Sequence, residues 1–260
     1  MSKILGASAE FTEYRAYRQG DETRRIDWKL FARSNRAYIK LSNERTVLPT
    51  MFLVDASASL AYPTQTREKW HYARQLVLGL AASAHGNGDP VGLLMRGADG
   101  MRHLPPRTRQ GVVYEIARML SSVEPAGSEP LAPLLAMLRS AGRVAIVSDF
   151  LGDADQMRAI ASQFAAAGRE VHAIHVLHAD ELDPPQDQAL LADPEDLSIK
   201  RPITSTTRRA YLRTFGVWRE ELARSWRMAG TYFTPVSTAE PVARAVRRIA
   251  MPQVVQTAGR

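Results

Sequence analysis

Two uninterrupted apolar runs, each leading into an aspartate, constrain the fold of this chain more than any other feature. Residues 51–54 (MFLV) end at Asp55, and residues 144–147 (VAIV) are followed by Ser148 and Asp149. Such runs are typical of central parallel strands, which are buried on both faces. The carboxyl ends of parallel strands form the crevice where these sheets bind ligands. Both aspartates are therefore predicted to lie at one rim of a sheet.

Helical and strand-like segments alternate along the rest of the chain. Apolar periodicity predicts helices at 67–84, 108–121, 131–140, 155–167 and 206–228, a short helix ending near 249, and further strands at 91–95, 170–177 and 231–236. This βαβα order predicts an α/β fold with a doubly wound parallel sheet and helices on both faces. The Pro- and Asp-rich stretch 180–196 is expected to be a long loop.

The helix expected over 206–228 has two distinct faces. An aromatic stripe is predicted to pack in the core, and an arginine face is predicted to be solvated. The stripe comprises Tyr211, Phe215, Trp218, Leu222 and Trp226, and the opposite face Arg209, Arg213, Arg224 and Arg227.

Composition excludes several classes of protein. The 260 residues include no cysteine, which excludes disulfides and thiolate chemistry. No apolar run approaches the roughly 18 residues of a membrane span, and the first residues lack the apolar stretch of a signal peptide, so a cytoplasmic location is expected. Residues 200–260 hold 12 Lys/Arg against 3 Asp/Glu, and residues 1–48 are also basic. These ends could bind nucleic acid or an acidic protein surface.

Sequence motifs give no support for common catalytic chemistries. The chain has no phosphate-binding P-loop, no dinucleotide-binding glycine motif and no serine-hydrolase elbow. His172, His175 and His178 are spaced by three along a predicted strand and its exit, so they cannot all face one way and are not expected to bind one metal ion. The chain is not expected to be an enzyme.

The segment Asp55-Ala56-Ser57-Ala58-Ser59 alternates oxygen-bearing and small side chains directly after a buried strand. On a tight turn, this spacing can direct one carboxylate and two hydroxyls toward a common point. Oxygen ligands of this kind suit a hard cation such as Mg²⁺. The alternative is that both serines only satisfy backbone groups at the turn.

This segment resembles the first loop of the metal-ion-dependent adhesion site (MIDAS) of von Willebrand factor A domains. The resemblance implies a threonine from a second loop and an aspartate from a third. Asp149 matches the third-loop position, and Ser128 after Gly127 matches the second, where the family usually has threonine. The resemblance therefore implies a Mg²⁺ or Mn²⁺ site formed by Asp55, Ser57, Ser59, Ser128 and Asp149. Ser128 could instead be the N-cap of the helix expected near Pro130.

A second resemblance covers nearly the whole chain. Residues 10–21, 23–29, 32–33, 88–93, 104–107 and 218–222 are similar to the signature of a bacterial family known as domain of unknown function fifty-eight. Its members contain a von Willebrand factor A-type domain and are commonly encoded beside MoxR-type AAA+ ATPases. The charged residues Asp21, Arg24, Arg25, Asp27 and Arg33 in this signature could form an ion-pair cluster that fixes the segment to the domain, or line a partner-binding surface.

The resemblances imply a domain organisation and a function. An amino-terminal extension, residues 1–48, is expected to pack on a von Willebrand factor A-like domain, residues 49–250, with a tail at 251–260. The function implied is a metal-dependent adaptor for a MoxR-type ATPase that matures or remodels a client protein, with a partner carboxylate completing the metal site. The alternatives are a Mg²⁺-dependent phosphoester hydrolase, a nucleic-acid-binding protein acting through the basic ends, and a scaffold without metal.

Overall fold

The computed structural model describes residues 13–19, 21–41, 47–97, 100–185, 191–192, 200–201 and 204–250. The chain divides into two compact units, residues 1–46 and 47–260. The predicted packing of an amino-terminal extension on the larger domain stays a prediction. The tail at 251–260 lies outside the described residues.

The first unit contains an antiparallel pair of strands, β1 (Glu13–Ala16) and β2 (Tyr38–Leu41), a short 3-10 helix (Thr23–Arg25) and helix α1 (Trp28–Ser34). Asp27 is the N-cap of α1, since its carboxylate accepts hydrogen bonds from the backbone N–H groups of Lys29 and Leu30. Asp21 forms an ion pair with Arg15, whose Nη2 lies 2.8 Å from Asp21 Oδ1.

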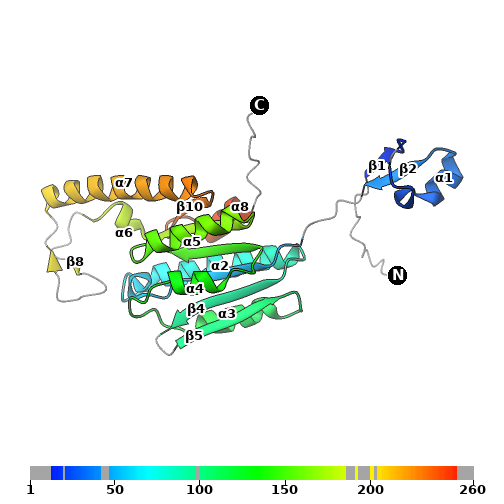
Figure 1. Ribbon diagram of the computed structural model, residues 1–260. Helices are drawn as coiled ribbons and strands as arrows, with labels where there is room; N and C mark the ends of the chain where they lie inside the picture. The colour runs from blue at the N-terminus through cyan, green and yellow to red at the C-terminus, as the bar shows by residue number, and fades with distance from the viewer. Residues whose placement is uncertain are drawn as a thin grey trace, which may run out of the picture. The chain divides into compact units, whose positions relative to one another are not determined.

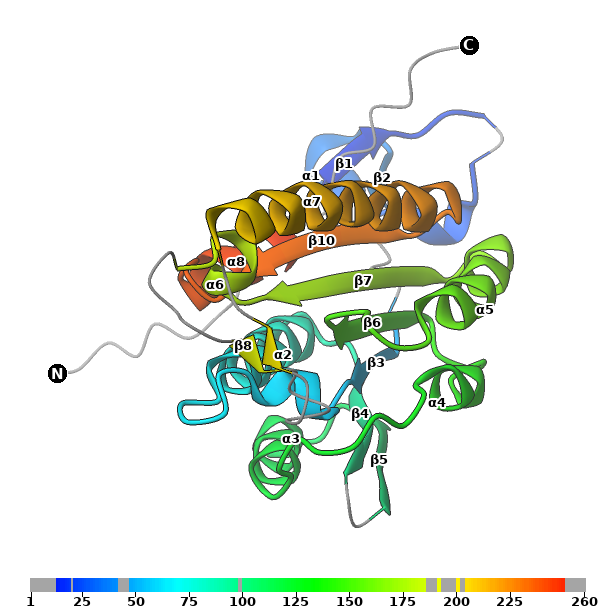
Figure 2. The same cartoon turned by 90° about the vertical axis from the view of Figure 1, so that its left-hand side faces the viewer.

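The second unit is built on a six-stranded sheet with strand order β10-β7-β6-β3-β4-β5 (Figures 1 and 2). All neighbouring strands are parallel except β4 and β5. The strands are β3 (Thr50–Val54), β4 (Val91–Gly97), β5 (Gly100–Arg107), β6 (Arg143–Ser148), β7 (Glu170–Leu177) and β10 (Tyr232–Ser237). The two predicted apolar runs are the central strands β3 and β6, and every residue of β3 is buried.

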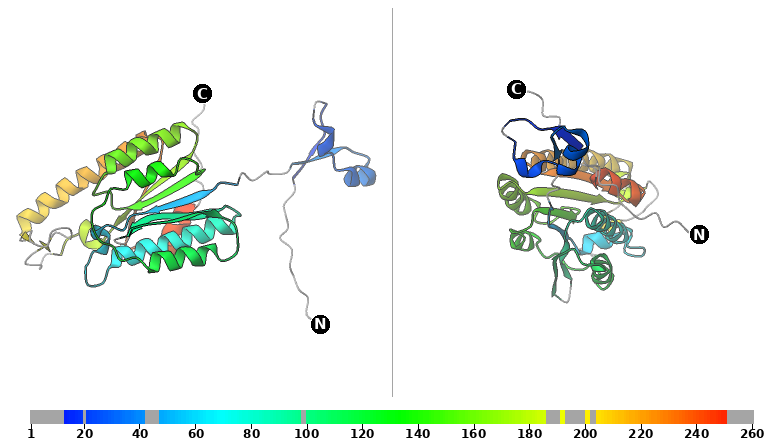
Figure 3. Two further views of the ribbon diagram at one scale, coloured as in Figure 1. Left: turned by 60° about the horizontal axis from the view of Figure 1, so that its bottom comes forward. Right: turned by 90° about the vertical axis from the view of Figure 1, so that its right-hand side faces the viewer.

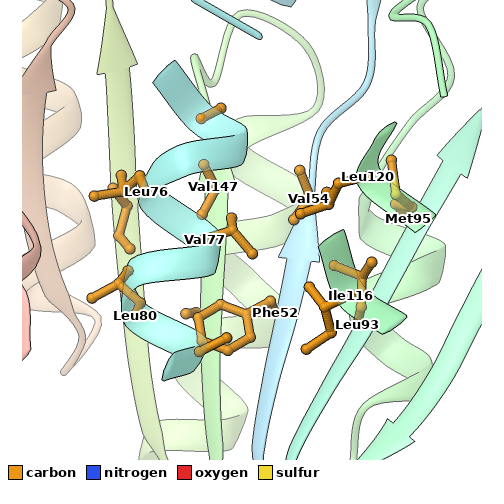
Figure 4. Close-up of a cluster of buried hydrophobic side chains, with 14 of the residues drawn as sticks. Phe52, Val54, Leu76, Val77, Leu80, Leu93, Met95, Ile116, Leu120 and Val147 are labelled. Carbon is orange, nitrogen blue, oxygen red and sulfur yellow. The ribbon is translucent and has the colours of Figure 1, made fainter. Parts of the chain in front are cut away.

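Helices cover both faces of this sheet, as Figure 3 shows. One face packs against α2 (Glu68–Gly86), α3 (Val112–Ser121) and α8 (Val242–Ala250), and the other against α4 (Ala132–Met137), α5 (Ala154–Ala166) and α7 (Ser205–Met228). Figure 4 shows the first core, in which Val77 of α2 points toward Phe52 and Val54 of β3. A 3-10 helix (Ala58–Ala61), α6 (Ala179–Leu182) and the short pair β8 (Leu191–Ala192) and β9 (Lys200–Arg201) complete the described elements.

Strand β5 was not among the strands predicted from the sequence, and it is the antiparallel member of the mostly parallel sheet. It forms an antiparallel edge beside β4, and its two prolines, Pro105 and Pro106, are tolerated because an edge strand need not donate every backbone N–H. The two strands approach closely at Gly92. A Cβ atom there would lie 2.5 Å from the Leu104 carbonyl oxygen, so only glycine fits.

The aromatic stripe of α7 is only partly in the core. Leu222 and Trp226 are buried, as predicted, whereas Tyr211 is 37% exposed. The amino-terminal half of α7 extends beyond the sheet (Figures 1 and 3), so its aromatic rings stack along the helix instead. The four arginines of the opposite face are exposed, as predicted. Helix α6 occupies the start of the predicted loop at 180–196, and most of the rest of that loop lies outside the described residues.

Candidate metal-binding site

Asp55 lies at the carboxyl end of β3, where the backbone is still held by the sheet. Its N–H donates to the Val147 carbonyl of β6 at 2.9 Å, and its side chain is almost fully buried. The carboxylate accepts a hydrogen bond from the Ser57 backbone N–H at 2.9 Å and one from the Ser148 hydroxyl at 2.6 Å. These bonds fix the orientation of the carboxylate at the rim of the sheet.

The two serines that follow bring their hydroxyls together. Ser57 Oγ and Ser59 Oγ are 3.0 Å apart. Two adjacent ligands of an octahedral Mg²⁺, each about 2.1 Å from the ion, are also separated by about 3.0 Å. The same distance suits a hydrogen bond between the hydroxyls, so the pair is compatible with both the metal-bound and the metal-free state.

The electrostatics of Asp55 favour a cation. Burial and the nearby charge of Asp149 raise the pKa of Asp55 to about 6, although hydrogen bonds from Ser148 and Ser57 lower it. Among the residues that the structure describes, no lysine, arginine or histidine forms an ion pair with this carboxylate. Asp55 is therefore a buried acid without a cationic side chain to balance it, and the donor set fits a divalent ion.

The second loop is attached to the first by two backbone hydrogen bonds. Ala126 N donates to Ala56 O at 2.9 Å, and Ala58 N donates to Gly127 O at 2.8 Å. Ser128 follows in this loop and is exposed. The two loops border an open depression of about 430 Å³, which Asp55 and Ser57 also line. The second loop thus runs beside the first, with the Ser128 side chain open to solvent.

The alternative role of Ser128 as a helix N-cap is wrong. Helix α4 begins at Ala132, its N-cap is Leu131, and the Leu131 side chain cannot accept a hydrogen bond. Asp153 takes that role from a distant part of the chain, since its carboxylate accepts from the backbone N–H groups of Leu131 and Ala132 at 3.1 and 2.6 Å. The Ser128 hydroxyl is therefore not engaged in capping.

The third loop turns sharply after β6. Phe150 adopts a left-handed backbone conformation, with φ at 56°, and its ring is buried against Trp226 and Phe233. A non-glycine residue in this region costs on the order of 1 kcal/mol, which the packing of the ring offsets. The turn is also held by Ser148 Oγ, which accepts from Phe150 N at 2.9 Å. As a result, Asp149 points inward while Leu151 is 54% exposed at the rim.

The residue that sequence reasoning missed is Lys69, in the first turn of α2. Its side chain is completely buried, and its Nζ contacts Asp149 Oδ2 at 2.8 Å and Glu181 Oε1 at 3.0 Å. The sequence does indicate that Lys69 is buried, because it lies on the apolar stripe of α2, four residues before the buried Ala73. A lysine on a buried stripe requires partner carboxylates.

The three histidines lie in three different environments. His172 stacks on Tyr232, His175 is buried among aromatic rings, and His178 contacts Glu68 at 3.0 Å. Burial lowers the pKa of His175 to about 3, so this side chain is neutral. Within the described ranges, no group of three or more histidine, aspartate or glutamate side chains is arranged to hold a metal ion, so a cation at this rim would depend on the serine hydroxyls.

Comparison with known families decides where the chain belongs. The family model described as "Protein of unknown function DUF58" matches residues 13–220. The chain belongs to the DUF58 family. It is 30% identical over 236 residues to an uncharacterized protein of Mycobacterium bovis and to one of Mycobacterium tuberculosis, covering 87% of this chain and 74% of each relative. The predicted family is thus confirmed.

Solved structures with a TM-score of 0.50 or above share the fold of this DUF58 protein. The conserved hypothetical protein BatB from Bacteroides thetaiotaomicron has a TM-score of 0.50 and 14% identity, covering 77% of this chain and 94% of BatB. An aerotolerance-related membrane protein from Bacteroides fragilis has a TM-score of 0.51 and 15% identity, covering 77% of this chain and 95% of that chain. The SpRpn10 VWA domain has a TM-score of 0.44 and 10% identity, covering 78% and 95% of the two chains.

The predicted fold class, a von Willebrand factor A-like, mostly parallel α/β sheet with helices on both faces, is confirmed. In the described part of the chain, no helix is both long and apolar enough to span a bilayer.

Proposed function

We propose that this DUF58 protein is a metal-dependent protein-interaction module and acts as the adaptor of a MoxR-type AAA+ ATPase in the maturation or remodelling of a client protein. One observation carries the metal dependence. The buried carboxylate of Asp55 has no cationic side-chain partner among the described residues, and it lies beside the hydroxyls of Ser57 and Ser59, which are spaced as adjacent ligands of one ion.

The residues of the three loops would hold Mg²⁺ or Mn²⁺ in complementary ways. Ser57, Ser59 and Ser128 offer neutral hydroxyl oxygens, and Asp55 and Asp149 supply negative charge from the carboxyl ends of β3 and β6. When bound, the ion would offer an open coordination position to a carboxylate of the partner. Neutral ligands favour this role because they leave the ion enough positive charge to attract an acidic group.

The surroundings of the site suit a protein partner better than a small substrate. The depression over Asp55 is open and is bordered by Arg96 and Glu129, whose exposed side chains form an ion pair at 3.2 Å. Leu151 adds an exposed apolar side chain at the rim. A partner surface with a carboxylate at its centre and an apolar residue beside it would match these features.

The deciding experiment measures binding of the purified MoxR-type ATPase by biolayer interferometry, with Mg²⁺ or with EDTA. We expect binding with Mg²⁺ that is lost in EDTA and in the Ser57→Ala variant. The control is Asp155→Asn, which removes a carboxylate that is 95% exposed, in the first turn of α5. Binding that is equally strong in EDTA would contradict the metal dependence, and no binding in either condition would contradict the partnership.

The same preparations test the hydrolase alternative. Metal-dependent turnover of a generic phosphoester that is lost in Asp55→Asn would replace the adaptor hypothesis with an enzymatic one. We expect no turnover above the buffer rate.

A further inference from the structure

The buried lysine behind the third loop carries a further inference. Lys69 Nζ has no exposure to solvent and is held between Asp149, whose side chain is 3% exposed, and Glu181, whose side chain is 21% exposed. A buried ammonium group loses its hydration, and nearby carboxylates are needed to offset that loss. The position of Lys69 is therefore set by these two acids.

Asp55 does not belong to the ion-pair cluster of Lys69. Asp55, Asp149 and Glu181 are three carboxylates, and Lys69 pairs with only the last two. The charge of Asp149 also acts on Asp55, so Asp149 stands electrostatically between the lysine and the candidate metal site. The same carboxylate is thus in contact with the Lys69 ammonium group and close enough to Asp55 for its charge to act there.

We propose that Lys69 is a tethered cation that competes with the divalent ion for Asp149 and thereby sets the affinity of the site on Asp55, Ser57 and Ser59. This inference rests on the proposed metal site. Two cations near one carboxylate repel each other, so an ammonium group that remains on Asp149 weakens the binding of the ion. Glu181 is the alternative anchor, because it already contacts the same Nζ at 3.0 Å.

Glu181 can retain its ion pair with Lys69 when Asp149 binds a metal ion. Its carboxylate also accepts a hydrogen bond from the His178 backbone N–H at 2.6 Å, as part of the capping box of α6. Its carbonyl oxygen accepts from Tyr211 Oη at 3.0 Å. Glu181 is thus fixed by α6 and α7 and does not depend on the metal-binding loops.

The test uses two substitutions with opposite expected effects on the affinity for Mn²⁺, measured by titration calorimetry at pH 7.5. Lys69→Met keeps the length of the side chain and removes its charge, so we expect Mn²⁺ to bind at least about tenfold more tightly, because the repulsion between the ammonium group and the ion is removed. Glu181→Gln leaves Asp149 as the single carboxylate partner of Lys69 among those named here, so we expect weaker Mn²⁺ binding than in the wild type.

The matched control removes a positive charge at the opposite end of the sheet. Arg139 is exposed and precedes the amino end of β6. Arg139→Gln is expected to leave the affinity for Mn²⁺ unchanged, because an exposed charge at that distance is screened by salt. Circular dichroism establishes that each variant is folded before the titration.

The outcomes separate this inference from the proposed metal site. Tighter binding by Lys69→Met with weaker binding by Glu181→Gln supports the competition. If the wild type binds Mn²⁺ and Lys69→Met binds no more tightly, the competition is refuted and the metal site stands. If no variant binds, both are refuted. If Lys69→Met does not fold, Glu181→Gln decides, and affinity equal to or above that of the wild type refutes the competition.

Discussion

Replacing Asp55 with asparagine should stabilise the metal-free protein at neutral pH, although the residue lies at the centre of the candidate site. Burial and the charge of Asp149 raise the pKa of Asp55 from 3.8 to about 6. Each pKa unit corresponds to about 1.4 kcal/mol, so keeping this carboxylate ionised in the folded state costs about 3 kcal/mol. Asparagine keeps an acceptor for the Ser57 N–H and removes the charge.

The pH dependence follows from the direction of this shift. Because the pKa of Asp55 is higher in the folded than in the unfolded chain, the folded state binds the proton more tightly. The free-energy cost of ionising Asp55 in the folded protein is absent below about pH 3.8, where Asp55 is protonated in both the folded and the unfolded chain. This cost is fully present above about pH 6. The stabilisation by Asp55→Asn should therefore be about 3 kcal/mol at pH 7.5 and close to zero at pH 4.

The assay is urea unfolding in EDTA, followed by far-ultraviolet circular dichroism. For a domain of this size the slope is about 2 to 3 kcal/mol per molar urea, so the midpoint should rise by about 1 M at pH 7.5. Asp155→Asn serves as the control, because its exposed carboxylate should change stability by less than about 0.5 kcal/mol. A variant that is less stable than the wild type at pH 7.5, or a difference independent of pH, would refute the reasoning.

Three further perturbations test the structure. His175→Gln should reduce the loss of folding stability between pH 7.5 and pH 5 by about 2 kcal/mol. The reason is that the pKa of His175 is lowered to about 3, so the folded state keeps this side chain neutral while the unfolded chain binds a proton below about pH 6.5. A loss of stability equal to that of the wild type, measured by urea unfolding at the two pH values, would contradict this. Gly92→Ala should destabilise the protein by at least about 2 kcal/mol, since its Cβ would collide with the backbone of β5, and an unshifted urea midpoint would show that β5 is placed wrongly. Asp153→Ala should cost about 1 kcal/mol, measured in the same way, because two backbone N–H groups at the start of α4 lose their acceptor; a neutral effect would mean that water replaces it.

The sequence by itself determined the central part of the fold and the identity of the loops around the candidate site. A strand buried on both faces must be apolar throughout, so β3 and β6 were visible as uninterrupted runs, and parallel pairing places the residues after them at one rim. The helices α2, α3, α4, α5, α7 and α8 were predicted to within a few residues, because a helix buries one stripe and its periodicity is local. Helices α1 and α6 are short and were not predicted. The MIDAS-like residues followed from resemblance to a family, since Asp55, Ser57 and Ser59 alone also suit an ordinary turn.

Only the tertiary structure decided which distant residues meet. The capping of α4 by Asp153 and the contact of Lys69 with Asp149 each join residues more than twenty positions apart, and local periodicity carries no record of such pairs. The partial exposure of the α7 stripe has the same origin, because amphipathic spacing shows which face is apolar but not how far the neighbouring sheet extends. Folding removes a charged side chain such as Lys69 from water, so an opposite charge must lie beside it. Which residue supplies that charge depends on the tertiary structure.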